Sequence, residues 1–585
     1  MSNQYQSETK NCQNCKTDFT IEPDDFSFYE KIKVPPPTFC PECRMKMRLA
    51  SLNHRGLFLS FCSKCGNKIS SMYLKNTDFV VYCTLCYFKD DWDASLYGQE
   101  YNPNKNFFVQ FFDLLKKVPQ LHIEHTNNNS GDIIFSNYVY RSKNIYLSYG
   151  VVRSENIFYS WGSHNGNKNC FDSMDFTYNE SCYELVDSIK NYACLHLTRS
   201  KNCLDSQYLY DCANCTNCFM SSNLRNQSYV FRNVQYAKEV YFRLLESQNL
   251  KNFEARKNLS EEYNKLIKNA IHKYAILQNA ILCTGDEITN SKNIQYGFSV
   301  QDSENSSYVQ ITTNTVTDCM DMSMSGRAES CYQLTVCGRG NYQSLCSYNI
   351  GNTKNIYYCD GCNNVSNCFG CVGLKNKEYC ILNKQYSKEE YLLLVEQIKK
   401  DMIDQPYVGS LGRIYIFGDY FPIEFSRFTY NQSMAHEMFP EKKEQILEKG
   451  LVWLDNDKKD HEHTTEFYDT QENLADDYEK ITTGAFPCEN QGNQNLCTKS
   501  FKIIKSELDF YIKYNLPLPR KCPNCRYFER KKKKLPWKLW HRTCMCDKTN
   551  HIHGDENCAI EFETSYAPDR PEIVYCEKCY QQEVI

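Results

Sequence analysis

The segment SKNIYLSYGVVRSENIFYS, residues 142–160, holds two copies of a short unit in which a Lys-Asn or Glu-Asn pair precedes an apolar-aromatic pair. Related units recur about every 12 residues through the middle of the chain: SKNIYLS at Ser142, SENIFYS at Ser154, NKNCFDS at Asn167, NESCYEL at Asn179, IKNYACL at Ile189, SKNCLDS at Ser200, SKNIQYG at Ser291, AESCYQL at Ala328, TKNIYYC at Thr353 and VSNCFGC at Val365. Each unit pairs a polar turn with a short alternating strand, which needs a stacked neighbour to bury one face. The repeats predict a parallel β-solenoid with Cys, Ile, Tyr and Phe inward. We expect two units to form one coil, because twelve residues is short for a coil that houses aromatic rings.

A larger duplication lies above this repeat. NCFMSSNLRNQSYVFRNVQYAKEVY from Asn217 matches NCFGCVGLKNKEYCILNKQYSKEEY from Asn367 with an offset of 150 residues. Each copy closes an array and runs into a predicted helix, and Ser387 with Glu390 forms a capping box for the second one. The sequence therefore predicts two related solenoid halves, separated by a helical insertion from Ala237 to Leu282.

The two ends of the chain are also copies of one another. CKTDFTIEPDDFSFYEKIKVPPPTFCPECR begins at Cys15, and CTKSFKIIKSELDFYIKYNLPLPRKCPNCR begins at Cys497. The same offset carries Cys62 onto Cys544, and after an insertion the later cysteines of both ends match as well. The duplication predicts two zinc modules at each end.

Paired cysteines at this spacing are typical of structural zinc sites. Two residues between cysteines let both thiolates reach one ion, and two such pairs complete a tetrahedral shell without an open position for substrate. We expect about four structural Zn²⁺ ions, held by Cys12, Cys15, Cys40, Cys43; Cys62, Cys65, Cys83, Cys86; Cys488, Cys497, Cys522, Cys525; and Cys544, Cys558, Cys576, Cys579. In the last site Cys546 is a spare, and His541, His551 or His553 could substitute for a cysteine.

Composition sets the outer limits of function. The chain has 585 residues, 41% of them apolar, 34 cysteines and a net charge of −4. No stretch is long and apolar enough to span a bilayer, and the start MSNQYQSETK lacks the regions of a signal peptide. Paired C-x-x-C motifs without a secretion signal indicate metal binding in a reducing compartment. We therefore expect a cytoplasmic protein without a membrane partner, whose oligomeric state the sequence leaves open.

One basic segment is a candidate nucleic-acid surface. Ten Lys or Arg lie between Arg520 and Arg542 against the single acid Glu529, and tryptophans interleave with them. Basic side chains neutralise phosphates and indoles stack on bases. The candidate contacts are Arg526, Arg530, Lys531, Lys532, Lys533, Lys534, Trp537, Trp540 and Arg542, and the N-terminal stretch RMKMRLASLNHR, residues 44–55, is similarly basic. A solvated helix face is the alternative interpretation, and the acidic stretch 455–479 is either a linker or a partner for the basic segment.

Cysteines in the middle of the chain could ligate an iron–sulfur cluster. Cys212, Cys215 and Cys218 have C-x₂-C-x₂-C spacing, but in the second half Val365 takes the place of Cys215. Small core positions tolerate such exchange and a ligand set does not. We therefore favour reduced thiols that pack in the solenoid core, here and at the pairs Cys359, Cys362, Cys368 and Cys371.

No catalytic constellation stands out in the sequence. The acids near the arrays are Asp172, Asp175, Asp187, Asp205, Asp318 and Asp321, and parallel β-helices can carry polysaccharide-cleaving sites. Aspartates at solenoid turns, however, usually cap backbone donors. HEH at 461–463 lacks the spacing of a metalloprotease. The sequence favours a non-enzymatic protein.

The motifs CPECRMKMRLA, LKNKEYCILNKQYSKEEY, LPLPRKCPNCR and ETSYAPDRPEIVYCEKCY, with the Asn-Cys-Tyr array, resemble a family of large zinc-ribbon proteins of candidate phyla radiation bacteria. The end modules are similar to the probable treble-clef zinc-binding domain. The resemblance implies zinc but no established activity.

Together these features predict a mainly β chain, a parallel β-solenoid (β-helix) in two halves flanked by treble-clef and zinc-ribbon modules. The expected domains are a treble-clef module 1–58, a zinc ribbon 59–90, a helical connector 91–119, a solenoid half 120–237, a helical insertion 238–282, a solenoid half 283–386, a helix 387–404, an acidic connector 405–485, a treble-clef module 486–530 and a basic segment with zinc ribbon 531–585. We expect a zinc-binding scaffold whose terminal modules contact nucleic acid or a protein. The alternatives are zinc modules that only cap the solenoid ends, or a carbohydrate-active β-helix enzyme.

Overall fold

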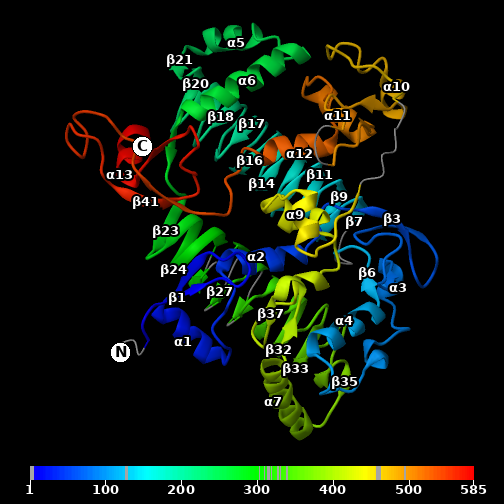
Figure 1. Cartoon of the computed structure of the whole chain (residues 1–585). Coiled ribbons are helices and arrows are strands. Elements are labelled where there is room, and N and C mark those ends of the chain that lie inside the picture. Colours follow the sequence, from blue (N-terminus) through cyan, green and yellow to red (C-terminus); the bar gives the residue numbers. More distant parts are fainter. Residues whose placement is uncertain are drawn as a thin grey trace.

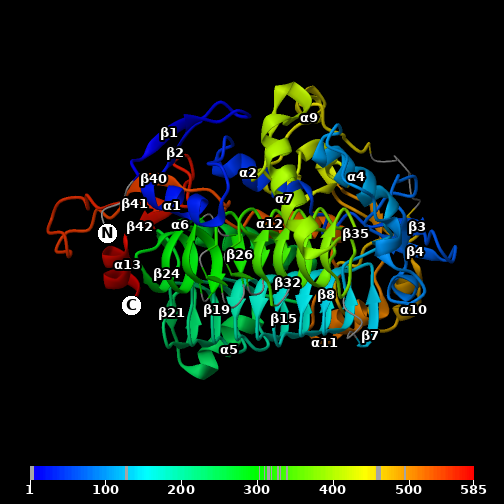
Figure 2. The same cartoon turned by 90° about the horizontal axis from the view of Figure 1, so that it is seen from below.

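The computed structural model describes residues 5–125, 130–301, 303–307, 310–312, 316–317, 319–325, 328–329, 331–337, 340–455, 463–492 and 496–585. Two stacks of short parallel strands lie side by side, with helices and small modules on their outer faces (Figure 1, Figure 2). The prediction of a mainly β chain with parallel strands is confirmed. Among the described residues, none of the helices combines the length and apolar character that crossing a bilayer requires.

The first stack runs from residue 130 to 235 and its strands alternate between two rows. Its strands are β7 (Ser130–Ile134), β8 (Asn137–Tyr140), β9 (Lys143–Tyr146), β10 (Tyr149–Val152), β11 (Glu155–Phe158), β12 (Trp161–His164), β13 (Lys168–Phe171), β14 (Met174–Thr177), β15 (Glu180–Tyr183), β16 (Val186–Ile189), β17 (Leu195–Thr198), β18 (Gln207–Tyr210), β19 (Thr216–Ser222), β20 (Ser228–Phe231) and β21 (Val234–Gln235). Ile145 pairs with Ile157, and Cys170 pairs with Cys182. One repeat unit therefore forms one layer, and the expectation of two units per layer is wrong.

The asparagine of several repeat units forms a corner of the layer. Asn144, Asn156 and Asn169 have φ angles of 53°, 54° and 53°, in the left-handed region that asparagine tolerates better than most residues. Their amides form a ladder, with 3.0 Å from Asn144 Nδ2 to Asn156 Oδ1 and 2.7 Å from Asn156 Nδ2 to Asn169 Oδ1. The Lys-Asn and Glu-Asn pairs at residues 143–144, 155–156 and 168–169 therefore encode a turn that repeats in these layers.

The interior of the first stack is narrow and holds small side chains. Ile145, Cys170 and Cys182 lie inside it and are at most 1% exposed. Phe158 and Phe171 point outward instead, and their rings stack with centroids 4.5 Å apart. The expectation of inward Cys and Ile is correct, whereas most aromatic rings of the units lie outside. A twelve-residue layer has little room for a ring, while neighbouring layers about 4.8 Å apart let rings stack on the outer face.

The second stack runs from residue 277 to 385 and has the same parallel arrangement. Its strands are β23 (Leu277–Ile281), β24 (Thr284–Gln301), β25 (Ser303–Ser307), β26 (Gln310–Thr312), β27 (Val316–Thr317), β28 (Ser323–Ser325), β29 (Ala328–Glu329), β30 (Thr335–Cys337), β31 (Tyr342–Leu345), β32 (Tyr348–Tyr357), β33 (Asn363–Phe369), β34 (Glu378–Ile381) and β35 (Lys384–Gln385). Each stack ends in an antiparallel hairpin, β20 with β21 and β34 with β35. The hairpins cover the last parallel edge, which would otherwise present unpaired backbone groups.

Helices follow each hairpin. They are α5 (Lys238–Glu246) and α6 (Phe253–Asn269) after the first stack, and α7 (Lys388–Asp404) after the second. The predicted capping box of α7 is confirmed, since Glu390 N donates to Ser387 Oγ at 3.2 Å and Ser387 N donates to Glu390 Oε2 at 3.0 Å. Tyr241 of α5 and Tyr391 of α7 are buried against their stacks.

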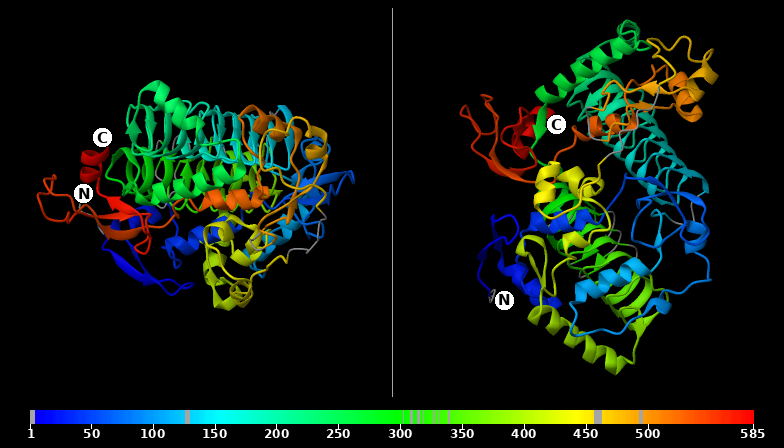
Figure 3. Two further views of the ribbon diagram at one scale, coloured as in Figure 1. Left: turned by 90° about the horizontal axis from the view of Figure 1, so that it is seen from above. Right: turned by 45° about the vertical axis from the view of Figure 1, so that its right-hand side comes forward.

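Small modules and connecting segments cover the sides of both stacks (Figure 3). The N-terminal ones contain β1 (Glu8–Asn11), β2 (Asp18–Ile21), α1 (Pro23–Ile32), α2 (Pro41–Ala50), β3 (Phe58–Phe61), β4 (Lys68–Ser71), β5 (Val81–Tyr82), α3 (Thr84–Tyr87), η1 (Ala94–Tyr97), α4 (Phe107–Lys117) and β6 (Gln120–Leu121). The segment after α7 contains β36 (Tyr407–Val408), η2 (Ser410–Gly412), β37 (Ile414–Tyr415), η3 (Ile423–Phe425), η4 (Tyr430–Gln432), α8 (Met434–Met438), α9 (Lys443–Glu448) and α10 (Tyr478–Thr483). The C-terminal modules contain β38 (Phe486–Pro487), β39 (Ser500–Phe501), α11 (Lys505–Lys513), α12 (Pro523–Lys531), β40 (Trp540–Thr543), β41 (Glu561–Thr564), β42 (Ile573–Tyr575), β22 (Ile271–Lys273), which pairs with β42, and α13 (Glu577–Val584).

One apolar cluster joins both stacks to both ends of the chain. It contains Leu49 of α2, Trp161 of the first stack, Tyr348 of the second and Tyr527 of α12. The tyrosine hydroxyls of Tyr138 and Tyr348 also meet across the stacks at 3.0 Å. The cysteine-rich modules at both ends of the chain are therefore part of the central core.

Candidate metal centres

The sixteen cysteines predicted to bind zinc gather into four groups of four, as the sequence grouped them. Within each group all sulfurs lie within 4.8 Å of one another. The groups are Cys12, Cys15, Cys40, Cys43; Cys62, Cys65, Cys83, Cys86; Cys488, Cys497, Cys522, Cys525; and Cys544, Cys558, Cys576, Cys579. All these cysteines are free thiols. Each group could hold a metal ion.

Sulfur–sulfur distances test whether zinc fits these groups. A tetrahedron with Zn–S bonds of 2.3 Å has edges of about 3.8 Å. One edge in each group measures 3.6 Å (Cys15–Cys40), 3.8 Å (Cys65–Cys83), 3.8 Å (Cys488–Cys525) and 4.0 Å (Cys558–Cys576). All four match a tetrahedral S₄ shell and are far longer than a disulfide bond of about 2.0 Å.

The backbone supports each group in the same way. The N–H of the third cysteine donates to the sulfur of the first one, at 3.3 Å, 3.3 Å, 3.2 Å and 3.2 Å. The donors are Cys40, Cys83, Cys522 and Cys576, each the N-cap of a helix. The second cysteine pair therefore sits in the first helical turn, where free N–H groups favour negative charge.

These hydrogen bonds favour the thiolate form that a metal requires. Side-chain hydrogen bonds from Cys40 and Cys43 hold the pKa of Cys12 far below its usual range. Burial opposes ionisation of Cys62, but three backbone N–H groups that donate to its sulfur lower its pKa to about 6. In both N-terminal groups one thiol is therefore shifted toward the thiolate form.

The C-terminal site shows which candidate ligands belong to it. Cys544 is in the group of four, so Cys546 and the histidines do not replace it. His541 is largely exposed and faces Glu561 and Glu563. Sequence reasoning missed that Cys546 belongs to a separate group with His551, His553 and Cys579. The signal was the clustering of three metal-binding residues, Cys546, His551 and His553, within eight positions of the inserted segment.

The central cysteines contact backbone carbonyl oxygens in the stack in the same way as the serines do. Ser148 Oγ donates to the carbonyl oxygens of Tyr146 at 2.9 Å and Ile157 at 3.2 Å. Cys182 Sγ makes the matching contacts to Glu180 at 3.2 Å and Asn191 at 3.6 Å. Burial raises the pKa of Cys182 well above its usual value, so the thiol stays protonated. In the described part of the chain, the groups able to hold a metal contain none of the central cysteines.

The basic segment at α12 faces the first stack (Figure 1). Arg526 Nη1 lies 2.9 Å from Asp172 Oδ2, and Arg530 Nη1 lies 2.6 Å from Asp172 Oδ1. Arg526 also lies 3.2 Å from Glu507 Oε1 of α11, and Arg530 Nη2 donates to the Tyr159 carbonyl oxygen at 2.9 Å. All four charged side chains of this cluster are buried, so these arginines are neutralised within the protein.

Lys534 joins the two stacks. Its Nζ lies 2.6 Å from Asp175 and 2.6 Å from Asp187 in the first stack, and 3.6 Å from Glu287 in the second. Burial opposes its charge, but Asp175 and Asp187 raise the pKa of Lys534 well above its usual value. The other residues of the predicted surface differ in exposure: Trp537 is buried, Lys531, Lys533, Trp540 and Arg542 are half-buried, and Lys532 is exposed.

The N-terminal module that contains Cys40 and Cys43 repeats this contact on the other stack. Arg44 Nε lies 2.6 Å from Asp321 Oδ2, and Arg48 Nη1 lies 3.3 Å from Asp321 Oδ1. These side chains are at most 1% exposed. Arg48 Nε also donates to Ser323 Oγ at 3.1 Å. The N-terminal module therefore docks on the second stack, and the C-terminal module docks on the first.

The two docked modules also touch one another. Arg55, which follows α2, donates from Nη2 to Asn524 Oδ1 at 2.6 Å. Its guanidinium lies 3.4 Å from the ring centroid of Tyr527. Both partners are on α12, so the ends of the chain meet between the stacks.

The acids considered as catalytic candidates fall into three classes. Asp172 and Asp321 receive arginine pairs, Asp175 and Asp187 receive Lys534, and Asp205 is exposed. Asp318 lies outside the described residues. Four of these side chains thus form ion pairs that hold the modules on the stacks.

Comparisons with protein-family models, with curated proteins and with solved structures found no match to this chain.

Proposed function

We propose that the protein is a non-enzymatic, zinc-stabilised scaffold, in which a parallel β-solenoid in two halves is clamped by treble-clef and zinc-ribbon modules from both ends of the chain. Four Zn²⁺ ions occupy the four cysteine groups. Their role is structural, because four cysteines fill a tetrahedral shell and leave no position for substrate.

The observation that carries this proposal is the pair of buried arginine–aspartate anchors. One aspartate in each stack receives two arginines from a helix that begins at a zinc-site cysteine. A buried charge without its partner costs about 3–5 kcal/mol, so each stack depends on the module that neutralises its aspartate. Zinc orders the helix, and the helix delivers the arginines.

Side docking distinguishes this clamp from modules that only cap the solenoid ends. Asp172 lies in the middle of the first stack, and the last layer of each stack carries its own hairpin. The anchors therefore support contact along the sides, with the two modules meeting through Arg55.

Zinc removal tests the proposal. We expect at least four zinc ions per purified chain, measured by elemental analysis, and a fall in melting temperature when a chelator removes them. Cys283→Ser is the control variant and should keep the zinc content and melting temperature of the wild type. Cys283 is outside the four groups, and its sulfur contacts the backbone carbonyl oxygens of Ile281 and Ser291. A chain that loses its zinc and keeps its melting temperature would contradict the proposal.

The partner of such a scaffold remains a proposal. Nucleic acid is the first candidate, through the exposed Lys532 with the half-buried Trp540 and Arg542, and a protein partner is the second. Lys532→Glu tests the first without breaking the buried ion pairs. A basic contact predicts weaker RNA or DNA binding and a shallower salt dependence for the variant. Unchanged binding across salt would exclude this surface.

A further inference from the structure

The last zinc ribbon differs from its N-terminal copy by an insertion. Cys62 corresponds to Cys544, and Lys64 stands where the later ribbon has Cys546. The inserted residues carry His551 and His553, before the second half-site begins at Cys558. The C-terminal ribbon therefore holds three additional metal-binding side chains that the N-terminal ribbon lacks.

These side chains converge on one ligand of the existing site. Ligand atoms of Cys546, His551, His553 and Cys579 lie within 4.8 Å of one another. His553 Nε2 is 3.3 Å from Cys546 Sγ, and His551 Nδ1 is 3.9 Å from the same sulfur. A tetrahedral zinc ion with one sulfur and one imidazole ligand separates these atoms by about 3.6 Å. The two distances lie on either side of that value.

A carboxylate supports one histidine from behind. His551 turns Nδ1 toward Cys546, while its Nε2 lies 3.5 Å from Glu583 Oε1 on α13. The His551 side chain is 2% exposed. Metal-binding histidines commonly direct their second nitrogen to a carboxylate, which fixes the ring and raises its basicity. This arrangement fixes Nδ1 as the atom that faces the metal.

The loop that carries the histidines is tied in place. His551 and Gly554 exchange backbone hydrogen bonds at 3.2 Å and 2.8 Å. Asn550 N donates to Asp555 Oδ1 at 2.8 Å, and Ile552 N donates to Gln582 Oε1 of α13 at 3.0 Å. Gly554 has a φ angle of 86°, a backbone conformation that would be strained in a residue with a side chain. The turn therefore holds both rings on the side of α13.

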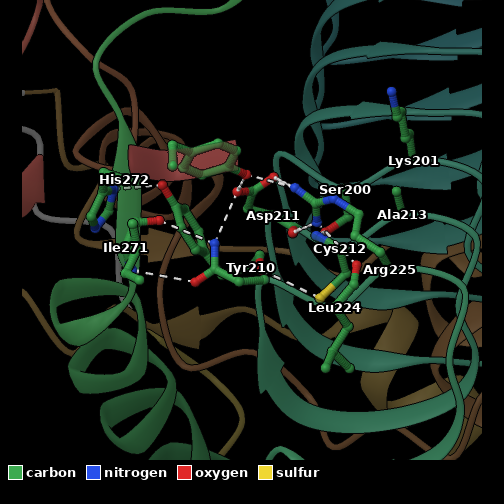
Figure 4. A network of polar contacts seen from close by, with 12 residues as sticks. Ser200, Lys201, Tyr210, Asp211, Cys212, Ala213, Leu224, Arg225, Ile271 and His272 are labelled. Atoms are coloured by element: carbon green, nitrogen blue, oxygen red, sulfur yellow. Dashed lines mark hydrogen bonds and ion pairs between the residues drawn. The ribbon is translucent and has the colours of Figure 1, made fainter. Parts of the chain in front are cut away.

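Helix α13, which carries Cys579, is seated on the first stack. Tyr580 donates to Asp211, and Arg225 Nη2 lies 3.0 Å from Asp211 Oδ1 and 2.6 Å from the Tyr580 hydroxyl. Figure 4 shows Asp211 and Arg225 on the stack and His272 beside them. The Tyr210 hydroxyl lies 2.6 Å from His272 Nδ1. Tyr580 therefore anchors α13 to the stack and fixes the position of the adjacent Cys579.

We propose that Cys546, His551 and His553 bind a fifth zinc ion, which shares Cys579 as a bridging thiolate with the ion of Cys544, Cys558 and Cys576. The inference rests on the proposed zinc occupancy of that cysteine group. Both ions then have four ligands, so the pair is a closed structural cluster. Binding of the fifth ion releases the thiol proton of Cys546, because only the thiolate ligates. The cluster fastens the inserted loop to α13.

Metal counting by native mass spectrometry on the full chain tests the fifth site. We expect five zinc ions in the wild type and four after the joint change His551→Ala and His553→Ala, with Cys546→Ser giving the same loss. His541→Ala is the matched control and keeps five, since His541 is exposed on β40. Bridging predicts that Cys579→Ser removes two ions, whereas Cys86→Ser in the N-terminal ribbon removes one.

X-ray absorption of the wild-type zinc protein tests the site without any variant. Four S₄ sites give a pure sulfur shell, and the fifth ion adds imidazole scattering. Four ions with a sulfur-only shell, and no loss in the histidine variant, would overturn the fifth site and leave the four cysteine sites intact. Fewer than four ions, with no further loss in Cys40→Ser, would instead contradict the four sites themselves.

Discussion

The two docking interfaces share one core and differ around it. At each, two arginines one helical turn apart reach a single aspartate: Arg44 and Arg48 with Asp321, and Arg526 and Arg530 with Asp172. The surroundings have diverged. The comparison teaches that the charge pairing defines the docking, whereas the packing around it can vary.

Aromatic contacts illustrate the divergence. In the C-terminal interface the ring of Phe510 stacks on Phe171 with centroids 4.0 Å apart. An edge-on tyrosine pair occurs at both interfaces, Tyr29 with Tyr332 at 5.4 Å and Tyr183 with Tyr511 at 6.1 Å. Glu507 also receives the hydroxyl of Tyr159 at 2.6 Å. The C-terminal interface therefore adds a stacked ring and a buried tyrosine hydrogen bond to the shared anchor.

Removing the shared aspartates should have the largest effect among single changes to the stacks. Asp172→Ala leaves Arg526 and Arg530 buried without their common partner, so we expect a loss of about 3–5 kcal/mol in unfolding free energy. Asp321→Ala should cost a similar amount if the two anchors are equivalent. Chemical denaturation measures both.

Asp205→Ala is the matched control for these variants, because Asp205 is an exposed acid of the first stack. Its expected cost is below about 0.5 kcal/mol. If Asp172→Ala and Asp321→Ala were as mild as this control, the anchors would not hold the modules. A large difference between the two would show that only one interface depends on its anchor.

A pH titration should sharpen the comparison, because the second stack has a titrating acid next to its anchor. Burial raises the pKa of Asp419 to about 7, against smaller opposing effects of the Ile416 N–H and Arg44. A carboxyl group with a raised folded-state pKa stabilises the protein below its unfolded pKa of about 4, and this contribution is lost as the pH rises through about 7.

Asp419→Asn should remove that pH dependence. We expect the variant to gain stability relative to the wild type as the pH rises from about 4 to about 7, reaching on the order of 4 kcal/mol at pH 8. Ile416 N can still donate to the amide oxygen, as it does to the carboxylate at 2.9 Å. Parallel pH curves for variant and wild type would show that Asp419 does not titrate in this range.

The smallest expected effect concerns the cysteines inside the stacks. Cys182→Ser and Cys371→Ser should each change the unfolding free energy by less than about 1 kcal/mol, because serine makes the same two backbone contacts in neighbouring layers. One variant lies in each stack, so equally small losses in unfolding free energy would show that the interiors of the two stacks tolerate serine alike. A loss of several kcal/mol in either would indicate a role for the sulfur beyond packing.

The four cysteine groups and the start of α7 could be predicted from the sequence. Cysteine spacing and the duplicated ends gave the four metal groups, because ligands of a tetrahedral site must lie on paired short turns. The capping box at Ser387 was equally local. The width of a layer could not be predicted from local sequence. Whether Phe158 points inward or outward depends on the distance between the two rows of strands.

The docking of the modules on the stacks could not be predicted from local sequence patterns. Basic residues on a helix are usually solvated or bind anions, and the sequence offered no sign that Arg530 would be buried. One signal was present. Arg44 and Arg48 recur as Arg526 and Arg530 in the duplicated end, while Asp172 and Asp321 each end a Cys-x-Asp pattern and lie 149 residues apart, one residue less than the offset of the duplicated stack. Matching the two duplications would have suggested the pairs, but not which module meets which stack.

Hydrogen–deuterium exchange on Cys522→Ser and Cys40→Ser tests the crossed docking most directly. Each variant removes one cysteine of a proposed zinc site, which should release one module. We predict that Cys522→Ser speeds exchange in the first stack around residues 155–183, and that Cys40→Ser speeds it in the second stack around residues 319–357. Faster exchange confined to the mutated module, with both stacks unchanged, would contradict the account.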